Sequence, residues 1–352
     1  MALAPDSAGS ATGSSAAPAG ASLAQVLERE LAKFQATTGV YVKHLTTGEE
    51  AGVRADQAFN SFSVIKLAIM VKAYQMADRK ELDLDQRIEV RRGDLRDGSG
   101  MLFMFDPGLR VTLRDLITQM IITSDNTATD LLLARVGGLE ALNGWLRDAG
   151  FTQTRMVQSI ADFFRQILVL RDAKYAGLSN EQVNAYLTHP TLVSDRWRDF
   201  YAIEGARLQK EAPLAEVTAA IGPLWSTNTE YWIGSMTPRE TARLLEGIET
   251  GALAAPQSSD QMKRILMWQR EGTLRIPHYL TVPVGHKTGD GPSVIANDVG
   301  MVYTPGGTIL ISFFSASNTA PYAEHEDRIG VLARAVVDYF AKTAPPVPPA
   351  AR

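Results

Sequence analysis

The sequence has no cysteine among its 352 residues. This absence excludes disulfide bonds, a thiol nucleophile, iron–sulfur clusters and cysteine-ligated zinc. Histidine is also scarce: five are present, and none lies three to five residues from another, as a metal-binding pair on a helix requires. We therefore expect no metal site and no cofactor. Any catalysis must use serine, lysine, tyrosine or a carboxylate, with at most one histidine.

Neither a strong positive charge nor a long apolar run is present. The 35 lysines and arginines are balanced by 39 aspartates and glutamates, for a net charge of −4. The clustered basic residues that bind a phosphate backbone are not indicated, so no nucleic-acid partner is expected. No apolar stretch approaches the ~18–20 residues of a membrane-spanning helix. Hydrophobic residues make up 45% of the chain, enough for the core of one large domain or two closely joined ones.

The two ends of the chain differ in composition from the rest. Residues 1–21 are mostly alanine, serine and glycine, and such a segment buries too little apolar surface to order itself. It contains no lysine or arginine and no continuous apolar stretch, so no export signal is recognisable. Residues 343–352 contain four prolines. We predict a disordered low-complexity tail over 1–21 and an extended proline-rich tail over 343–352.

Strand signals lie near both ends of the chain, and helical signals lie between them. The patterns predict a hairpin over 40–59 and three later strands, over 280–284, 293–303 and 308–315. Helical periodicity is clear over 64–76, is interrupted once within 111–132, and returns over 324–340. This order predicts an α/β (α+β) fold: an antiparallel sheet built from both chain ends and flanked by helices, with an all-helical block inserted.

The first candidate catalytic motif is Ser63-Val64-Ile65-Lys66, at the start of the helix predicted over 64–76. Residues i and i+3 share a helix face, so Lys66 lies one turn behind Ser63. A serine hydroxyl becomes nucleophilic when a base takes its proton, and a buried lysine near a second cation has a pKa low enough to be that base. The helix N-terminus also supplies N–H groups for an oxyanion. Taken alone, the motif is more often a helix-capping serine followed by a surface lysine.

Two further triplets carry polar groups. Ser124-Asp125-Asn126 interrupts a strongly apolar helix, where its serine could relay a proton and its asparagine hold a substrate amide; a turn between helices is the structural alternative. Lys287-Thr288-Gly289 lies on or just before a sheet edge, where the lysine and threonine suit a substrate carboxylate and the glycine permits close approach. An ordinary strand end is the alternative there. Each triplet alone is weak evidence, but the three motifs in this order are improbable by chance.

With these three motifs the chain resembles the class A β-lactamase family. The resemblance extends to residues 54–59, to Gly137-Gly138, to Thr237-Pro238 and to Trp268, and it covers about residues 22–158 and 232–342. It implies a β-lactamase and penicillin-binding-protein-like fold with the site in a cleft between two subdomains. These are an α/β subdomain, residues 22–62 and 232–342, and an all-helical subdomain, residues 63–231, with an insertion at about 159–231.

The resemblance also implies roles within the site. Ser63 would be the acylated nucleophile, Lys66 its activating partner, and Ser124 the group that passes a proton to the leaving nitrogen. The implied substrate-binding residues are Asn126 for the acyl side-chain amide, Lys287 and Thr288 for the substrate carboxylate, Gly289 for close approach, and the Asp290 N–H, with that of Ser63, for the oxyanion.

The sequence departs from the family pattern after residue 150. Where the family carries a Glu-x-x-Leu-Asn motif whose glutamate positions the deacylating water, this chain has Ile160. Ser124 and Lys287 lie 163 residues apart, several dozen more than in the family, so the insertion follows the altered loop. Gly98-Ser99-Gly100 stands where an aromatic gatekeeper is usual, and we expect that wall of the site to be open.

Acylation therefore has its full set of residues, whereas deacylation lacks its usual base. Three outcomes are compatible with this: another carboxylate, Asp162 or an acid in the insert such as Glu204, replaces the glutamate; Lys66 serves both steps with a substrate more labile than a penicillin; or the acyl-enzyme persists. The sequence favours a serine acyl hydrolase of the class A β-lactamase-like family, acting on a β-lactam, ester or amide with weak or atypical β-lactam hydrolysis. The alternatives are a penicillin-binding or acyl-transferring protein with slow deacylation, and a non-catalytic binding module.

A small-molecule acyl substrate is the expected partner. The insertion at 159–231 is interpreted as extra helices packed on the body, or as a lid or a contact within an oligomer. The family resemblance implies a periplasmic or secreted location.

Overall fold

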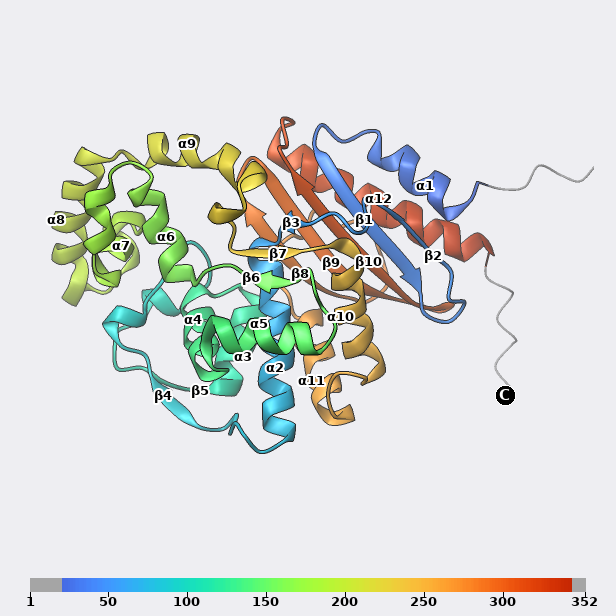
Figure 1. Ribbon diagram of the computed structural model, residues 1–352, viewed down its shortest axis with the longest axis horizontal. Coiled ribbons are helices and arrows are strands. Elements are labelled where there is room, and N and C mark those ends of the chain that lie inside the picture. The colour runs from blue at the N-terminus through green and yellow to red at the C-terminus, as the bar shows by residue number, and fades with distance from the viewer. Residues whose placement is uncertain (1–20, 344–352) are drawn as a thin grey trace, which may run out of the picture.

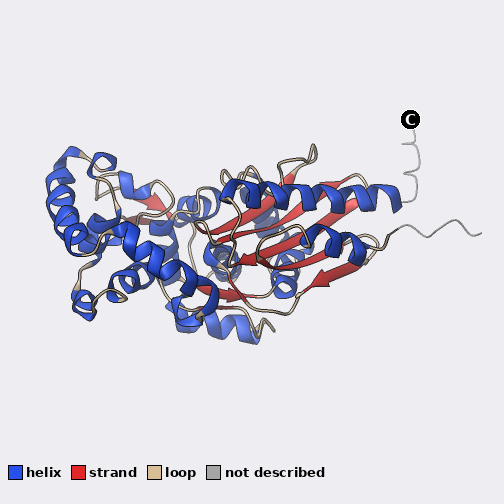
Figure 2. Cartoon of the chain, turned by 90° about the horizontal axis from the view of Figure 1, so that it is seen from above, coloured by secondary structure: helices blue, strands red, loops and turns tan. Residues whose placement is uncertain are grey.

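The computed structural model describes residues 21–343. The predicted tails over 1–21 and 343–352 lie outside this range except for their innermost residues, and Thr343 ends the last helix. A sheet with helices on both sides forms one end of the molecule, and a purely helical lobe forms the other (Figures 1 and 2). This is the mixed arrangement, an antiparallel sheet flanked by helices, that the sequence predicts.

Five antiparallel strands form the main sheet in the order β2-β1-β10-β9-β8. The N-terminal hairpin supplies the first two strands, and the C-terminal part supplies β8, β9 and β10. Their bounds are β1 (Thr37–His44), β2 (Glu50–Val53), β8 (Val284–Gly291), β9 (Ile295–Thr304) and β10 (Gly307–Ala316). In register, Val40 lies opposite Val53 and Phe313, and Lys287 lies opposite Val299. Lys287 therefore lies on β8, an edge strand of this sheet.

The strand predicted over 280–284 is wrong, because the strand begins at Val284 and runs on through the polar stretch that follows. Pro283 has no N–H to offer to a strand ladder, and Leu280 packs as a loop residue against the apolar cluster on one face of the sheet. The polar stretch forms the strand because its side chains find buried hydrogen-bonding partners. The His286 ring, for example, lies 2.9 Å from a carboxylate oxygen of Asp298 on β9.

Helices cover both faces of the sheet (Figure 2). On one face lie α1 (Leu23–Leu31) and α12 (Tyr322–Thr343), whose Leu27 and Leu332 pack in one apolar cluster with Ile311 of β10. On the other lie α10 (Pro238–Thr250) and α11 (Pro256–Met267), which contact β10 and β8 respectively. Because both faces are covered, β9 and β10 are buried along most of their length.

The helical region is built around α2 (Lys66–Asp78), whose first nine residues are all buried. A helix that is buried all round belongs to the core of a large protein. Around it lie α3 (Leu113–Ile122), α4 (Asn126–Arg135) and α5 (Gly138–Asp148), with the predicted interruption between α3 and α4. Short strands complete the region: β3 (Phe59–Asn60), β7 (Gly234–Met236) and β6 (Arg155–Met156) pair in one small sheet, and β4 (Arg87–Glu89) pairs with β5 (Arg110–Thr112).

Most of the segment predicted to be an insertion forms a helical lobe at one end of the molecule, built on four α-helices (Figure 1). We call residues 160–227 the insert lobe; it comprises α6 (Ile160–Val169), α7 (Asn180–Leu187), α8 (Asp195–Glu211) and α9 (Leu214–Thr227). Two of its rings reach the body, since Phe163 and Trp225 pack with their centroids 5.9 and 5.4 Å from that of Phe62, next to Ser63. The insert lobe is thus packed on the body beside the candidate nucleophile.

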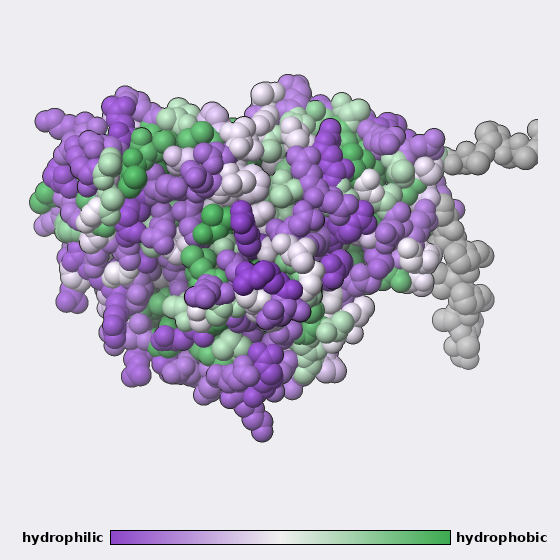
Figure 3. Space-filling view, viewed as in Figure 1, coloured by the Kyte–Doolittle hydropathy of each residue, from purple (hydrophilic) through white to green (hydrophobic). Residues whose placement is uncertain are grey.

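The surface seen in Figure 3 is mostly hydrophilic, with separate hydrophobic patches over the body and the insert lobe. Within residues 21–343, none of the helices has the length and apolar character needed to cross a bilayer.

Candidate active site

The three sequence motifs meet at one cavity of about 620 Å³, which is bounded by the sheet edge, the start of α2, the α3–α4 turn and the insert lobe. All eight residues singled out from the sequence lie at this cavity or in direct contact with residues that line it. Ser63, Ser124, Asn126 and Asp290 line it, and Lys66, Lys287, Thr288 and Gly289 are joined to them by the contacts described below.

Ser63 lies in a 3-10 turn, residues 62–65, that leads into α2. The backbone before it is constrained: Phe62 has a φ of 44°, an uncommon conformation for a side-chain-bearing residue. Its N–H donates to Asn60 Oδ1 (3.3 Å), and Asn297 Nδ2 of β9 donates to the Asn60 carbonyl oxygen (2.9 Å). The half-exposed Ser63 is therefore held at the cavity by a turn that is tied to the sheet.

Gly289 permits β8 to approach this turn closely. A Cβ atom at position 289 would stand 2.3 Å from the Ser61 carbonyl oxygen and 3.2 Å from the Ser63 backbone nitrogen. Only glycine fits such a distance. The edge of β8 thus lies directly against the nucleophile's backbone, with Asp290 as the next residue along the strand.

Lys66 is completely buried at the start of α2, three residues after Ser63. Its Nζ donates to the Ser124 carbonyl oxygen (2.6 Å), to Ser124 Oγ (3.2 Å) and to Asn126 Oδ1 (2.9 Å). Burial, reinforced by the Lys287 ammonium, lowers the pKa of Lys66 to about 7, although the Glu271 carboxylate acts in the opposite direction. A lysine with this pKa is partly neutral near neutral pH, so it can accept a proton.

Ser124 lies between the two lysines at the α3–α4 turn and has a φ of 53°. Its Oγ accepts hydrogen bonds from Lys66 Nζ (3.2 Å) and from Lys287 Nζ (3.0 Å), and its carbonyl oxygen accepts one from Ser99 Oγ (2.6 Å). A hydroxyl has two acceptor positions and one donor. With both acceptor positions occupied, the Ser124 O–H proton is left to donate, and Ser124 faces the cavity.

Asn126 begins α4, directly after the capping residue Asp125, whose carboxylate accepts from the Ala128 N–H (2.8 Å). The Asn126 side chain is fixed on both ends: Oδ1 accepts from Lys66, and Nδ2 donates to the Asp97 carbonyl oxygen (2.8 Å). An amide nitrogen carries two hydrogens. Its orientation is therefore fixed, while one N–H is still available at the cavity.

Lys287 and Thr288 are completely buried on β8. Besides Ser124, the Lys287 Nζ donates to the Thr288 carbonyl oxygen (2.9 Å). The Thr288 hydroxyl donates to Glu271 Oε2 (3.3 Å). Asp290, farther along the same strand, accepts a hydrogen bond from Tyr322 (2.8 Å) and forms an ion pair with the buried Arg275.

Sequence reasoning missed several residues that line the cavity. The charged ones are Asp97, Glu271, Arg275 and Glu326, which belong to no motif. The apolar ones come largely from the insert lobe: Phe163, Phe164, Ile167, Leu187, Leu214 and Trp225. One indirect signal was present in the sequence, namely aromatic residues in a segment with no assigned role. Their position beside Ser63 could not be predicted, because it depends on how the insert lobe folds back onto the body.

At the wall expected to be open, Gly98-Ser99-Gly100, an aromatic ring stands beside an exposed glycine. Phe164 of α6 packs there, and its Cζ lies 2.6 Å from where a Cβ of Gly98 would stand. Gly98 also has a φ of 90°, which favours glycine. An aromatic ring does stand at this wall, but the insert lobe supplies it rather than the loop itself.

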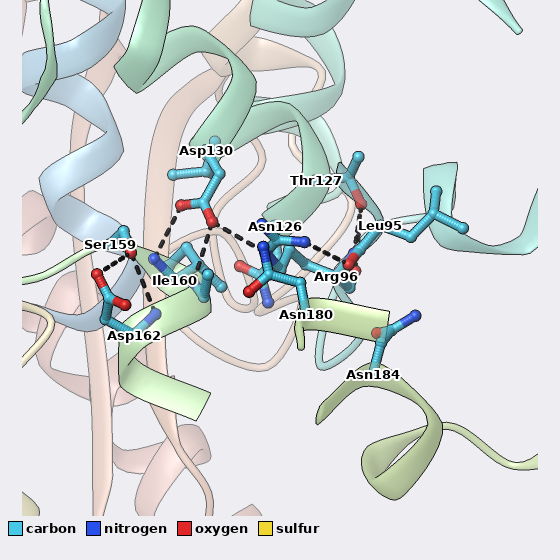
Figure 4. Close-up of polar contacts among 12 residues, drawn as sticks. Leu95, Arg96, Asn126, Thr127, Asp130, Ser159, Ile160, Asp162, Asn180 and Asn184 are labelled. Atoms are coloured by element: carbon cyan, nitrogen blue, oxygen red, sulfur yellow. Dashed lines mark hydrogen bonds and ion pairs between the residues drawn. The ribbon is translucent and has the colours of Figure 1, made fainter. Parts of the chain in front are cut away.

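Ile160 stands where the family's glutamate is expected, and its side chain is 1% exposed in the main apolar core. Figure 4 shows how the backbone there is held: the Ile160 and Ala161 N–H groups donate to the two carboxylate oxygens of Asp130 (2.8 and 3.0 Å), which also pairs with Arg96 (3.0 Å). We call this contact the Asp130 clasp. Ile160 is not among the cavity-lining residues.

Neither carboxylate proposed as a substitute base lines the cavity. The Asp162 carboxylate accepts hydrogen bonds from Ser159 (2.7 Å) and Arg165 (2.8 Å) at an exposed helix start. Glu204 lies on α8, and its carboxylate accepts hydrogen bonds from Gln182 (2.7 Å) and Arg207 (2.6 Å). The alternative in which Asp162 or Glu204 replaces the glutamate is therefore not supported by the position of either residue.

The fold and the placement of these residues define a class A β-lactamase-like architecture. Among solved structures, the chain is similar to the ancestral (GNCA) class A β-lactamase, with a TM-score of 0.67 and 23% identity over 91% of this chain and 100% of that one. It is also similar to the β-lactamase from Sphaerobacter thermophilus DSM 20745, with a TM-score of 0.66 and 23% identity over 92% and 97% of the two chains. At these identities the likeness concerns the fold.

The chain belongs to the beta-lactamase enzyme family, whose model matches residues 22–340. Among curated relatives, it is 35% identical to beta-lactamase L2 of Stenotrophomonas maltophilia over 117 residues, which are 33% of this chain and 38% of that protein. It is 30% identical to beta-lactamase ROB-1 of Haemophilus influenzae over 177 residues, 50% of this chain and 57% of that protein. These matches span about half of each relative or less.

Proposed function

We propose that the protein is a serine acyl hydrolase that forms an acyl-enzyme on Ser63 with an ester, amide or β-lactam, and that its β-lactam hydrolysis is weak or atypical. The observation that carries this proposal is the position of Lys66, three residues after Ser63 and completely buried, with a pKa lowered to about 7 and a hydrogen bond to Ser124. A lysine in such a site is partly neutral near neutral pH and is suited to the role of a general base.

In the acylation step, neutral Lys66 takes the proton of Ser63, and the Ser63 oxygen forms a bond to the carbonyl carbon of the substrate. The backbone N–H groups of Ser63 and Asp290 receive the oxyanion. The bond to the leaving group then breaks, and the Ser124 hydroxyl gives the leaving atom its proton. The Lys66 ammonium, which donates to Ser124 Oγ (3.2 Å), returns that proton to Ser124.

In the deacylation step, we propose that Lys66 acts again as the base. It takes a proton from water, the water oxygen attacks the acyl carbon, and the carboxylic acid leaves as Ser63 recovers its proton. This assignment is supported by the buried Ile160 and by the displaced positions of Asp162 and Glu204. A base that must serve both steps favours substrates with an activated carbonyl, and it accounts for poor turnover of a stable β-lactam acyl-enzyme.

The acyl group of the substrate is, in this proposal, large and apolar. Six apolar residues of the insert lobe face the cavity, and the rings of Phe163 and Trp225 stack with centroids 5.9 Å apart beside Phe62. Ligand pockets gain most of their affinity from such apolar walls. The Asn126 amide is available for one hydrogen bond to the acyl side.

Intact-mass spectrometry tests the proposal by reading acylation and deacylation separately. We expect p-nitrophenyl phenylacetate and benzylpenicillin to add their acyl mass to the protein, and the Ser63→Ala variant to show neither adduct. The phenylacetyl adduct should decay with the release of phenylacetate, and the penicilloyl adduct should decay much more slowly. An absence of any Ser63-dependent adduct or product release would contradict the proposal.

The second candidate is a penicillin-binding or acyl-transferring protein, favoured by Ile160 in place of the usual glutamate. Adducts of both compounds that persist, or that leave only when an acceptor amine is added, would support it. The non-catalytic binding module is supported only if Ser63→Ala retains full function in a binding assay. A periplasmic or secreted location and an oligomer formed through the insert lobe stay predictions.

A further inference from the structure

Glu271 is a carboxylate inside the cavity that belongs to none of the three motifs. It lies in the loop that follows α11, is half-buried and lines the cavity. Its Oε2 accepts the hydrogen bond of the Thr288 hydroxyl (3.3 Å). That hydroxyl is one of the two groups to which the family resemblance gives the substrate carboxylate, so an internal carboxylate already occupies one of these donors.

The loop that carries Glu271 packs directly against β8. Gly272 has a φ of 68°, and a Cβ there would stand 2.4 Å from Thr288 Cγ2. Only glycine permits this conformation and this approach. The Arg270 N–H donates to the Ile122 carbonyl oxygen at the end of α3 (2.9 Å), which fixes the other side of the loop. Glu271 is thus held over Thr288 between two backbone anchors.

The charges around Glu271 leave no surplus of positive charge for an anionic substrate. The buried Arg275 pairs with Asp290 and with Glu326 (3.0 Å). Burial lowers the pKa of Lys287, and Glu271 is the strongest influence in the opposite direction. Three basic side chains, Lys66, Lys287 and Arg275, are therefore set against four carboxylates that line the cavity, those of Asp97, Glu271, Asp290 and Glu326. A second anion brought beside Glu271 would meet like charge in a partly desolvated site.

We propose that Glu271 determines substrate specificity by occupying the carboxylate position beside Thr288, so that the site favours acyl donors with no carboxylate on the leaving-group side. The substrate class is then an ester or amide with an apolar acyl group and a neutral or cationic leaving group. This inference rests on the proposed acyl-enzyme chemistry at Ser63 and adds to it the polarity of the leaving group. It also gives a physical reason for weak action on penicillins, which carry a carboxylate at that position.

The test uses two esters that share one acyl group. One is p-nitrophenyl phenylacetate, and the other is the phenylacetyl ester of 3-carboxy-4-nitrophenol, which differs by a carboxylate on the leaving group. Acylation kcat/KM is measured for each ester on the full chain, on Glu271→Gln and on Glu271→Ala. Glu204→Gln is the matched control, because it removes the same charge from a glutamate outside the cavity.

We expect the unmodified chain to prefer the neutral ester by about tenfold or more, since like charges at close range discriminate strongly. Both Glu271 variants should raise the rate on the carboxylated ester, relative to the rate on the neutral ester, by about tenfold. Glu204→Gln should leave the ratio of the two ester rates unchanged. Melting temperatures of all variants verify that they are folded.

Two results would overturn the inference. One is an unchanged ratio between the esters in both Glu271 variants. The other is an equal loss on both esters, which would identify Glu271 as a base or as a structural support. Failure of the acyl-enzyme proposal is distinguishable, because then neither ester adds its acyl mass to the unmodified chain at Ser63.

Discussion

On the sheet side of the cavity Lys287, Thr288 and Glu271 present polar groups, whereas on the insert side Phe163 and Trp225 present aromatic rings. Lys66 and Lys287 are completely buried on the polar side, and their hydrogen bonds span 2.6 to 3.2 Å. The apolar side packs through ring contacts that have no such directionality. Changes on the polar side should therefore affect the chemical step, and changes on the apolar side should affect which acyl group is accepted.

The difference also concerns how each side is anchored. The polar groups stand on α2, β8 and the α3–α4 turn, elements tied into the main core, and preorganised groups of this kind stabilise a transition state without reorganisation. The apolar groups stand on α6 and α9, which connect to the body at their ends (Figure 1). An insert can change without disturbing the catalytic groups, so acyl selectivity can vary while the acylation residues stay in place.

The largest expected effect is that of Lys66→Met on acylation. The variant should lower acylation kcat/KM by about 100- to 10,000-fold, because it removes the general base. Lys66→Arg should be equally inactive, since a guanidinium does not give up its proton near neutral pH. Stopped-flow release of p-nitrophenol from the phenylacetyl ester measures this rate. Lys72→Met, another buried lysine of α2 but outside the cavity, is the matched control and should keep its rate.

The next effect is a dependence of acylation on pH. Burial and the neighbouring Lys287 lower the pKa of Lys66 to about 7, and only the neutral amine can accept the Ser63 proton. The acylation rate should therefore fall about tenfold per pH unit below pH 7 and level off above it. Single-turnover measurements between about pH 5.5 and 8.5 give the profile. A flat profile over this range would mean that Lys66 is not the base.

The polar side, apart from Glu271, is also the part of the site that the sequence could predict. The motifs around Ser63, Ser124 and Lys287 consist of short runs whose local conformation, a helix start, a turn and a strand, is encoded nearby in the chain. That the three motifs lie at one cavity was predicted from the family resemblance and not from the local patterns. The family membership and the antiparallel sheet flanked by helices are confirmed by the family match and the fold comparison.

The apolar side could not be predicted in the same way. Phe164 fills the space above Gly98 only because α6 folds back across the body, and contacts between residues so far apart in sequence leave no local signal. Glu271 was missed for a related reason, since its position depends on Gly272 packing on β8. The strand error at 280–284 shows the same limit: the polar run from 286 to 291 becomes a strand because tertiary partners satisfy it.

On the apolar side we expect Trp225→Ala to change selectivity rather than chemistry. Removal of the indole opens space beside Phe62, so kcat/KM for the phenylacetyl ester should fall about 10- to 100-fold. The acetyl ester of the same phenol, which does not reach this wall, should change by less than about threefold. Trp197→Ala is the matched control, because Trp197 lies in the insert lobe but away from the cavity. An equal loss on both esters would contradict the division between the two sides.

The smallest expected effect on catalysis comes from Asp130→Asn, which weakens the Asp130 clasp at the start of α6. The change removes the charge that pairs with the nearly buried Arg96 and one acceptor for the Ile160 and Ala161 N–H groups. The free energy of unfolding should therefore fall by about 1–3 kcal/mol in urea denaturation. Acylation by the acetyl ester should change by less than about threefold, because Asp130 is hydrogen-bonded to Arg96, Ile160 and Ala161 rather than to a catalytic group, and its charge is only a minor influence on the pKa of Lys66.

Asp162→Asn is the control for this last change, since Asp162 lies on the same helix start but is exposed and pairs with Arg165 at the surface. Its unfolding free energy should shift by less than about 0.5 kcal/mol. If Asp130→Asn behaves like Asp162→Asn, the insert lobe is held by ring packing alone. If it instead lowers acetyl-ester acylation as strongly as Lys66→Met does, the two sides of the cavity are coupled through α6, and the separation of chemistry from acyl selectivity fails.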